Sequence, residues 1–403
     1  MEVYWGKRGM ELKVKFFEQG TMDGSYCFYA PGCVVGFLSW ADEDGALKNW
    51  IPFGYIPLDA YGRGSVRLLG GRGIPPAATH IYVRAVQDDL TQWRESLIPI
   101  PQECRTLPMQ EEIHFCVMSD LHLSTKMGTV MQAFSMAKGA DALLLAGDMT
   151  NDGTKHQYDL LKNCLSSILP KTPVFSVIGN HDIPRISPDQ KEQSDTEHYY
   201  RFQKWLLEGT ERKVPDIEYG PDGAYAVRLG KVEVIGLQAV TNQRKFLFEE
   251  GRQLEWLDQH LSKNQQLSWH LILCHAPLLH HNPKREAETN HPYLNRDQQL
   301  QEIVDRYGTV IFISGHTHLS MDNLDGCVEW EKNSYNLYVN DGSIRPTDLL
   351  SNEIIQPSEW KNGTVLDIRI CDAEVEIITR SVRDGKSHAR GYYRVKKGDR
   401  KRS

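Results

Sequence analysis

The sequence predicts an α/β domain, with mixed sheets flanked by helices, preceded by a small all-β sandwich. Between residues 113 and 178, apolar runs alternate with helical patterns in βαβαβ order, which is typical of a parallel sheet covered by helices. Residues 1–95 instead hold short alternating segments separated by glycine-rich turns. Residues 96–112 contain three spaced prolines, which disfavour helices and central strands, and are a predicted linker.

Four segments of the N-terminal region are predicted strands: 12–16, 33–38, 66–69 and 79–85. The first alternates polar and apolar residues with period two, as a half-buried strand does. The pattern Tyr82-Val-Arg-Ala85 resembles a late strand of fibronectin-type sandwiches. Four tryptophans in this region could form a carbohydrate-binding face or pack in the core, and core packing is the commoner use: Trp5, Trp40, Trp50 and Trp93.

The second domain is predicted over residues 113–385. Its strands are predicted at 113–118, 142–146, 174–178, 224–229, 232–237, 271–274, 310–314, 336–339, 364–370 and 374–378. Its helices are predicted at 129–138, 158–169, 197–207, 252–261 and 297–306. The insertion Ile183–Asp222 could wall the site as a lid, or its helix could be an ordinary surface helix with one apolar face.

Composition narrows the classes of function. The 403-residue chain has a net charge of −7, which gives no general attraction to nucleic acid or to an anionic membrane. No apolar run approaches the roughly 20 residues of a membrane span, and the N-terminus lacks the apolar region of a signal peptide. The eight cysteines form no CxxC pair, so we expect reduced thiols and a cytoplasmic protein. Residues 386–403 are basic and are a predicted solvated tail.

Five polar motifs each follow an apolar run of the second domain. They are Asp120-Leu-His122, Gly147-Asp148, Gly179-Asn-His-Asp182, His275 and Gly315-His-Thr-His318. In open α/β sheets, ligands bind beyond the carboxyl ends of the strands, so we expect these motifs to meet.

The side chains of these motifs are of types that commonly bind metal ions. Asp120 and His122 stand one residue apart, and in an extended loop both would project to the same side, as would His316 and His318. Gly147 permits a sharp turn that aims Asp148, and a carboxylate can bridge two ions. Together the motifs offer oxygen and nitrogen ligands without a thiolate, a set that suits manganese, iron, zinc or cobalt and suits calcium poorly. Two ions about 3.5–4 Å apart recur in enzymes that hydrolyse phosphate esters.

Each ligand taken singly has an ordinary structural alternative. Asp120 could cap a helix, and His275 could be a hydrogen-bonded histidine at a strand end. Histidines outside the motifs are expected to be structural or exposed: His114, His280, His281 and His291.

In this order, the five motifs resemble the full motif series of calcineurin-like metallophosphoesterases, over about residues 113–320. The resemblance implies the metallophosphoesterase fold and two transition-metal ions, with Mn, Fe or Zn expected. It also implies the division of the seven ligands, with Asp148 shared between the ions: Asp120, His122 and His318 on the first ion and Asn180, His275 and His316 on the second. The nucleophile would be a hydroxide bridging the ions. The resemblance further implies that His181 faces the substrate phosphate and helps to protonate the leaving oxygen. It also implies that Asp182 orients the loop of the third motif.

The motif details resemble one branch of this family. Purple acid phosphatases lack the histidine that stands here as His122, and their tyrosine ligand falls where this chain has Thr150-Asn151. Protein serine/threonine phosphatases end the third motif in Glu, whereas this one ends in Asp182. The run Gly147–Tyr158 is most similar to class III cyclic-nucleotide phosphodiesterases and related bacterial proteins. That similarity implies hydrolysis of a small phosphodiester or phosphomonoester, with (cyclic) nucleotides first among the candidates.

Two other functions remain open from the sequence. The N-terminal β-domain could make the chain a binding or adaptor protein that recognises a glycan or a partner. A nuclease would share the motifs, but the chain lacks the basic groove that long nucleic acid needs. The expected partner is therefore a small phosphoester substrate, with no long nucleic acid and no membrane. The sequence predicts no oligomeric state.

Overall fold

The computed structural model describes residues 2–7, 10–15, 19–22, 24–43, 53–68, 73–107, 109, 112–124, 127–184, 196–209, 214, 216–241, 245–284, 290–319, 327–331, 334–344, 363–385 and 387–397. The chain divides into two compact units. The N-terminal unit comprises Met1–Glu111, Glu374–Thr379 and Lys386–Ser403, and the α/β unit comprises Glu112–Ala373 and Arg380–Gly385. Among the described residues, no helix has the length and apolar character needed to cross a membrane.

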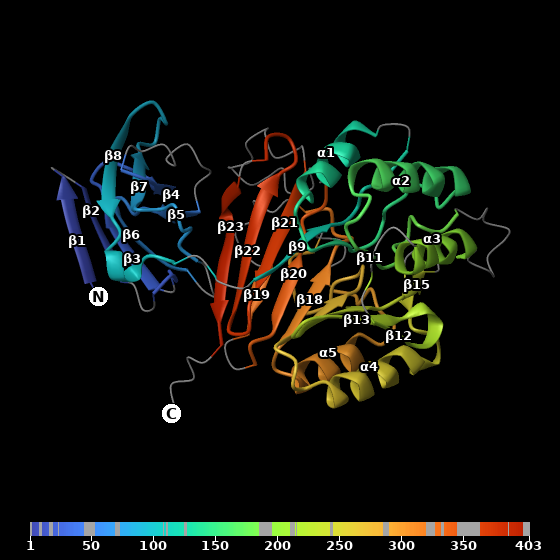
Figure 1. Cartoon of the computed structure of the whole chain (residues 1–403). Coiled ribbons are helices and arrows are strands. Elements are labelled where there is room, and N and C mark those ends of the chain that lie inside the picture. Colours follow the sequence, from blue (N-terminus) through green and yellow to red (C-terminus); the bar gives the residue numbers. More distant parts are fainter. Residues whose placement is uncertain are drawn as a thin grey trace. The chain divides into compact units, whose positions relative to one another are not determined.

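The N-terminal unit contains two four-stranded antiparallel sheets (Figure 1). The first has the order β1 (Glu2–Lys7), β2 (Met10–Lys15), β3 (Gly24–Tyr29), β6 (Arg63–Leu68). The second has the order β5 (Gly54–Pro57), β4 (Val35–Ala41), β7 (His80–Val86), β8 (Trp93–Pro99). Alternate side chains of both sheets fill one common core, including Leu12, Tyr26 and Phe28 from one and Leu38, Trp40 and Ile81 from the other. The predicted small all-β domain is confirmed.

The tryptophans of this unit have different environments. Trp40 is buried and stacks on Phe53 with ring centroids 4.2 Å apart, as core packing predicts. Trp93 is instead 55% exposed. The side chains of Trp5 and Trp50 lie outside the described residues. Strand β8 continues to Pro99, past the expected start of the linker, because β8 is an edge strand and a terminal proline there costs no interior ladder bond.

The C-terminal basic segment differs from the predicted solvated tail. Residues Ser387–Lys396 form strand β23, and β22 precedes it at Glu374–Ser381. Tyr392, Arg394 and Val395 are buried, and the Arg394 guanidinium pairs with Glu374 at 2.5 Å. Composition alone does not show that the stem of an arginine is buried or that its charge is paired. The basic residues of this segment were therefore wrongly predicted to form a solvated tail.

The first sheet of the α/β unit begins with the strand order β11-β10-β9-β21. Strands β9 (Ile113–Met118), β10 (Ala142–Leu145) and β11 (Val174–Ser176) are parallel, and β21 (Thr364–Ile370) runs antiparallel to β9. Helices α1 (Gly128–Met136), α2 (Lys155–Ile168) and α3 (Glu197–Glu208) pack on this sheet through one apolar core (Figure 1). The α3 residues in that core are Tyr199, Phe202 and Leu206, so α3 is a packed structural helix.

The second sheet of this unit has seven strands in the order β12-β13-β14-β17-β18-β20-β19. They are β12 (Ile217–Tyr219), β13 (Tyr225–Leu229), β14 (Val232–Gly236), β17 (Trp269–Leu273), β18 (Val310–Ser314), β20 (Leu337–Asn340) and β19 (Val328–Trp330). Strands β14, β17, β18 and β20 are parallel neighbours. Helices α4 (Arg252–Lys263) and α5 (Asp297–Arg306) pack on it through a separate core, and β15 (Val240–Thr241) pairs with β16 (Phe246–Leu247).

The two sheets of the α/β unit also pack against each other. The ring of Phe175 on β11 lies 6.5 Å from that of Tyr225 on β13, and the Tyr225 hydroxyl donates to the Ser176 carbonyl at 2.9 Å. Continuous apolar runs such as 142–145 follow from burial on both faces, against helices on one side and the other sheet on the other. The predicted α/β fold with flanking helices is confirmed.

Candidate metal centre

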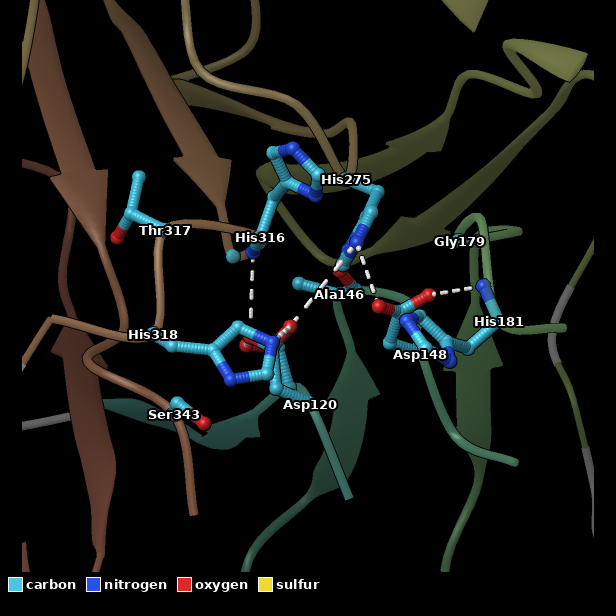
Figure 2. A network of polar contacts seen from close by, with 12 residues as sticks. Asp120, Ala146, Asp148, Gly179, His181, His275, His316, Thr317, His318 and Ser343 are labelled. Atoms are coloured by element: carbon cyan, nitrogen blue, oxygen red, sulfur yellow. Dashed lines mark hydrogen bonds and ion pairs between the residues drawn. The ribbon is translucent and has the colours of Figure 1, made fainter. Parts of the chain in front are cut away.

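The five polar motifs lie at the carboxyl ends of five parallel strands. Three follow β9, β10 and β11 of the first sheet, and two follow β17 and β18 of the second. The two sheets therefore contribute to one site from two sides, and Figure 2 shows Asp120, Asp148, His275, His316 and His318 converging there.

The loops that carry these side chains are not extended. Five of the expected ligands have left-handed backbone, with φ of 51° at Asp120, 42° at His122, 51° at Asp148, 69° at His316 and 54° at His318. The expectation that Asp120 and His122 project together from an extended loop is therefore wrong in its geometry, and so is the matching expectation for His316 and His318. A left-handed non-glycine residue costs about 1–3 kcal/mol, so the surroundings must hold these loops in place.

Hydrogen bonds between the loops supply that restraint. The Asp120 amide donates to the Gly147 carbonyl and the His122 amide to the Asp148 carbonyl, each at 3.0 Å. The Asp182 carboxylate accepts from the Thr150 and Gly179 amides, both at 2.9 Å, and so joins the second motif to the third.

The three motif glycines are required by space. A Cβ on Gly147 would collide with the His275 ring, one on Gly179 with the Asp148 carboxylate, and one on Gly315 with Ser119. Larger residues at these positions would push the loops apart.

The side chains form two groups whose possible ligand atoms lie within 4.8 Å of one another. The first comprises Asp120, His122, Asp148 and His318, and the second Asp148, His275 and His316. In the first, His318 Nε2 lies 3.1 Å from Asp120 Oδ1 and 3.0 Å from His122 Nε2. In the second, His275 Nε2 lies 3.3 Å from Asp148 Oδ2. Asp148 belongs to both groups, and His316 and His318 are divided between them.

The donor atoms fit metal ions. Four polar atoms of these loops are buried without a hydrogen-bond partner: Asp120 Oδ1, Asp148 Oδ2, Asn180 Oδ1 and His275 Nε2. Leaving such atoms unsatisfied is costly, and a bound cation would satisfy all of them. The His275 Nδ1–H donates to the Ala146 carbonyl at 2.7 Å, which directs Nε2 inward, as in metal-binding histidines. Burial opposes protonation of His275, but the Asp148 and Asp120 carboxylates outweigh it and raise the pKa of His275 to about 10, so a metal ion bound at Nε2 would replace a proton.

The electrostatics of the site favour charged carboxylates. Burial opposes ionisation of Asp148, but the His275 and His122 imidazoles outweigh it and hold the pKa of Asp148 below its usual value. Burial lowers the pKa of His122 to about 4, despite the nearby Asp148 and Asp120, and thereby favours the neutral ring that binds metal. Burial and the charge of Asp148 raise the pKa of Asp182.

His181 belongs to neither group. Its amide donates to Asp148 Oδ1 at 2.7 Å (Figure 2). Its Nδ1 donates to the Asn151 carbonyl at 2.9 Å. The ring packs edge-on against His122 with centroids 4.5 Å apart. With Nδ1 occupied, Nε2 is the atom that can exchange a proton.

The remaining histidines lie elsewhere. His114 bonds to Asp367 at 2.9 Å, and His281 bonds to Glu329 at 2.8 Å and stacks on Tyr338. His280 and His291 are exposed.

Sequence reasoning missed two residues beside the site, Asn340 and Asp341, which contact the ligand loops. They follow the apolar run Leu337–Val339, so the pattern that found the other motifs was present here too. The order Asn340-Asp341-Gly342 resembles an ordinary turn, which hides this motif in the sequence.

Comparisons with known proteins give consistent matches. A family model described as calcineurin-like phosphoesterase matches residues 113–320. The chain is 29% identical over 189 residues to a probable cyclic nucleotide phosphodiesterase of Moraxella catarrhalis (strain BBH18), covering 40% of this chain and 65% of that protein. It is 25% identical over 184 residues to a probable cyclic nucleotide phosphodiesterase of Synechococcus sp. (strain ATCC 27144), covering 45% of this chain and 59% of that protein. The chain thus spans less than two thirds of each relative's length.

Among solved structures, a conserved uncharacterized protein of Streptococcus pneumoniae TIGR4, described as a predicted phosphoesterase, aligns with a TM-score of 0.31 at 13% identity. That alignment covers 72% of this chain and 99% of the other.

Proposed function

Because the chain belongs to the calcineurin-like phosphoesterase family, we propose that it is a di-metal phosphohydrolase that cleaves a small phosphodiester or phosphomonoester. The family that the motifs resemble is confirmed, and both curated relatives carry the name of the expected branch. The observation that carries the proposal is that Asp148 belongs to both ligand groups, as a carboxylate bridging two ions would.

The proposed ligands follow the two groups. Asp120, His122 and His318 would hold one ion, His275, His316 and Asn180 the other, and Asp148 both. Asn180 is assigned through its buried, unpartnered Oδ1 and through its neighbour His181, whose amide donates to Asp148. The donor set supports Mn, Fe or Zn. When bound, the ions would supply an activated water and polarise the phosphoryl oxygens.

His181 would act on the substrate side of the centre. Its Nδ1 contact with Asn151 fixes the ring, so a protonated Nε2 can donate to a phosphoryl oxygen and then to the departing oxygen. Asp182 would hold the His181 loop against Thr150 and would not touch the substrate.

Substrate selection is proposed to involve a cavity of about 430 Å³. Its lining includes Tyr200 and Asp222 from the insertion 183–222, and Gln238, whose side chain accepts from the Ile178 amide just before the third motif. None of the proposed metal ligands is among its lining residues, and Asp222 and Glu249 place carboxylates in it. The cavity therefore suits the base and ribose of a small nucleotide and not its phosphate. Asp222→Asn should change the KM ratio among nucleotide phosphodiesters by about 10-fold at unchanged metal content. Equal KM ratios in the variant and the wild type would show that the cavity does not contribute to substrate selection.

The test of the activity uses bis-p-nitrophenyl phosphate and metal-reconstituted protein. We expect hydrolysis by the wild type, and a loss of about 10²–10⁴-fold in kcat for Asp148→Asn and for His181→Ala. Only Asp148→Asn should also lose metal. The exposed-loop variant His280→Ala is the matched control and should match the wild type. Full activity in both site variants would contradict the mechanism.

A further inference from the structure

Two consecutive residues at the carboxyl end of β20 contact proposed ligand loops that come from different sheets. Asn340 is the last residue of β20, and Asp341 follows it. Both are buried, with exposures of 2% and 0%. The Asn340 side chain reaches the loop after β18, and the Asp341 side chain reaches the loop after β9.

Asp341 contacts the ligand Asp120 through a serine. The Ser119 hydroxyl lies 2.5 Å from Asp341 Oδ1 and also contacts Asp120 Oδ2. Main-chain bonds fix both partners, since the Asp341 amide donates to the Ser314 carbonyl at 3.0 Å and the Ile344 amide to the Ser119 carbonyl at 3.3 Å. The second carboxyl oxygen of Asp341 is buried without a hydrogen-bond partner.

Asn340 restrains the loop that carries His316 and His318. Its Nδ2 donates to the Gly315 carbonyl at 2.9 Å, and its Oδ1 accepts from the Thr317 hydroxyl at 3.1 Å. The bonded residues Gly315 and Thr317 flank His316, and Thr317 also precedes His318. They hold a loop that contains two left-handed residues, His316 and His318.

We propose that Asn340 and Asp341 are positioning residues that set the affinity of the metal centre, Asp341 acting through Ser119 on Asp120 and Asn340 acting on the Gly315–His318 loop. This inference rests on the proposed function. The Asp341 oxygen buried without a donor is costly by itself, and a pair of cations held next to Asp120 would offset that cost. Residues that orient metal ligands typically contribute 10–100-fold to metal affinity.

The test is a double-mutant cycle read out by Mn²⁺ binding to metal-free protein, measured by titration calorimetry. Asp341→Ala and Ser119→Ala should each weaken Mn²⁺ binding by about 10–100-fold. The double variant should be no weaker than the worse single variant, because the two residues act in one chain of contacts. Asp341→Asn keeps the acceptor for Ser119 and should recover part of the loss. If Asp341→Ala fails to fold, Ser119→Ala and Asp341→Asn still test the proposal.

Asn336 provides the matched control. It stands at the other end of β20, is equally buried, and bonds to the Val310 amide and the Val304 carbonyl. Asn336→Ala should lower the unfolding midpoint without changing Mn²⁺ affinity. Wild-type Mn²⁺ affinity in Ser119→Ala and Asp341→Ala, or an equal loss in Asn336→Ala, would overturn the positioning role. A wild type that binds no Mn²⁺ would instead overturn the proposed function itself.

Discussion

At the scale of single residues, the site combines strained backbone with close packing. The left-handed residues Asp120, His122 and Asp148, which are proposed metal ligands, are held by bonds between their own loops, so each loop depends on its neighbour. Such strain persists only where the surroundings over-determine it, and functional sites are where it concentrates. Small changes of volume next to these loops should therefore act on the metal centre before they act on the fold.

Gly179→Ala tests this dependence. The added methyl group would collide with the Asp148 carboxylate, so we expect metal affinity and kcat to fall by at least about 10-fold. Gly128→Ala is the control, because a Cβ there meets nothing within 4 Å. Mn²⁺ titration and hydrolysis of bis-p-nitrophenyl phosphate measure both effects. Equal metal affinity in the two variants would contradict the packing argument.

The site could be predicted from sequence to the extent that its residues follow strands. Asp120, Asp148 and His275 each follow an apolar run. The parallel order of β9 and β10 accounts for the meeting of Asp120 and Asp148. His275 follows β17 of the second sheet and meets them only through the packing of the two sheets, which the strand pattern does not predict. The division of His316 and His318 between two groups could not be derived from spacing, because it depends on left-handed φ angles. Asp341 was missed because its partner Ser119 is 222 residues away in sequence.

At the scale of secondary-structure elements, buried apolar runs were the reliable signal. Strands β9, β18 and β21 were predicted with their observed bounds, since each is apolar over most of its length. Short strands such as β15 and β16 carry too few residues for a periodic pattern. Strand β23 was hidden by its basic residues, which composition alone assigns to solvent.

A polar cluster away from the proposed metal ligands joins three strands of the second sheet to helix α4. Glu233 on β14 accepts from His260 on α4 at 2.9 Å and from His270 on β17 at 2.6 Å, and Glu218 on β12 lies 3.2 Å from the other His260 nitrogen. Burial opposes the charged form of His260, but the Glu233 hydrogen bond outweighs it and raises the pKa of His260 above 6.5. Burial likewise opposes ionisation of Glu233, yet the two imidazoles lower the pKa of Glu233 below 4.5.

This cluster predicts a pH-dependent stability. Because the pKa of His260 is raised on folding, its contribution to the free energy of unfolding is fully present below pH 6.5. This contribution is lost as the pH rises through the folded-state pKa of His260. Because the pKa of Glu233 is lowered on folding, its contribution to the free energy of unfolding is fully present above pH 4.5. This contribution is lost as the pH falls through the folded-state pKa of Glu233. His260→Gln should therefore lower the free energy of unfolding most between these values, by about 1.5–3 kcal/mol near pH 5.5, and less near pH 9.

Denaturant unfolding at the two pH values measures this effect. His280→Gln, at an exposed position, is the control and should change neither value. An equal cost of His260→Gln at both pH values would show that the ion pair contributes nothing to stability.

At the scale of the whole molecule, the proposed metal centre predicts that metal binding stabilises the folded chain. The ligands come from loops of two sheets, so an ion bound by the folded chain ties those sheets together and unfolding must release it. Removing the ions leaves buried carboxylates facing each other without a cation.

Metal removal should lower stability in a predictable way. At a free Mn²⁺ concentration of 100 times the Kd, binding at one site stabilises the fold by about 2.7 kcal/mol. We expect chelation to lower the unfolding midpoint and Mn²⁺ to restore it, and we expect Asp148→Asn to show a smaller shift. The same midpoint with and without Mn²⁺ would argue against a site formed only in the folded chain.

The central claim is a two-ion centre shared at Asp148. The most direct measurement is the number of Mn²⁺ ions bound per chain, obtained by titrating metal-free wild type and Asp148→Asn and confirmed by elemental analysis. We predict two ions per chain for the wild type and weakened binding at both sites in Asp148→Asn, because one carboxylate serves both groups. A single ion per chain, or a variant that loses affinity at only one of two sites, would contradict the bridging role of Asp148.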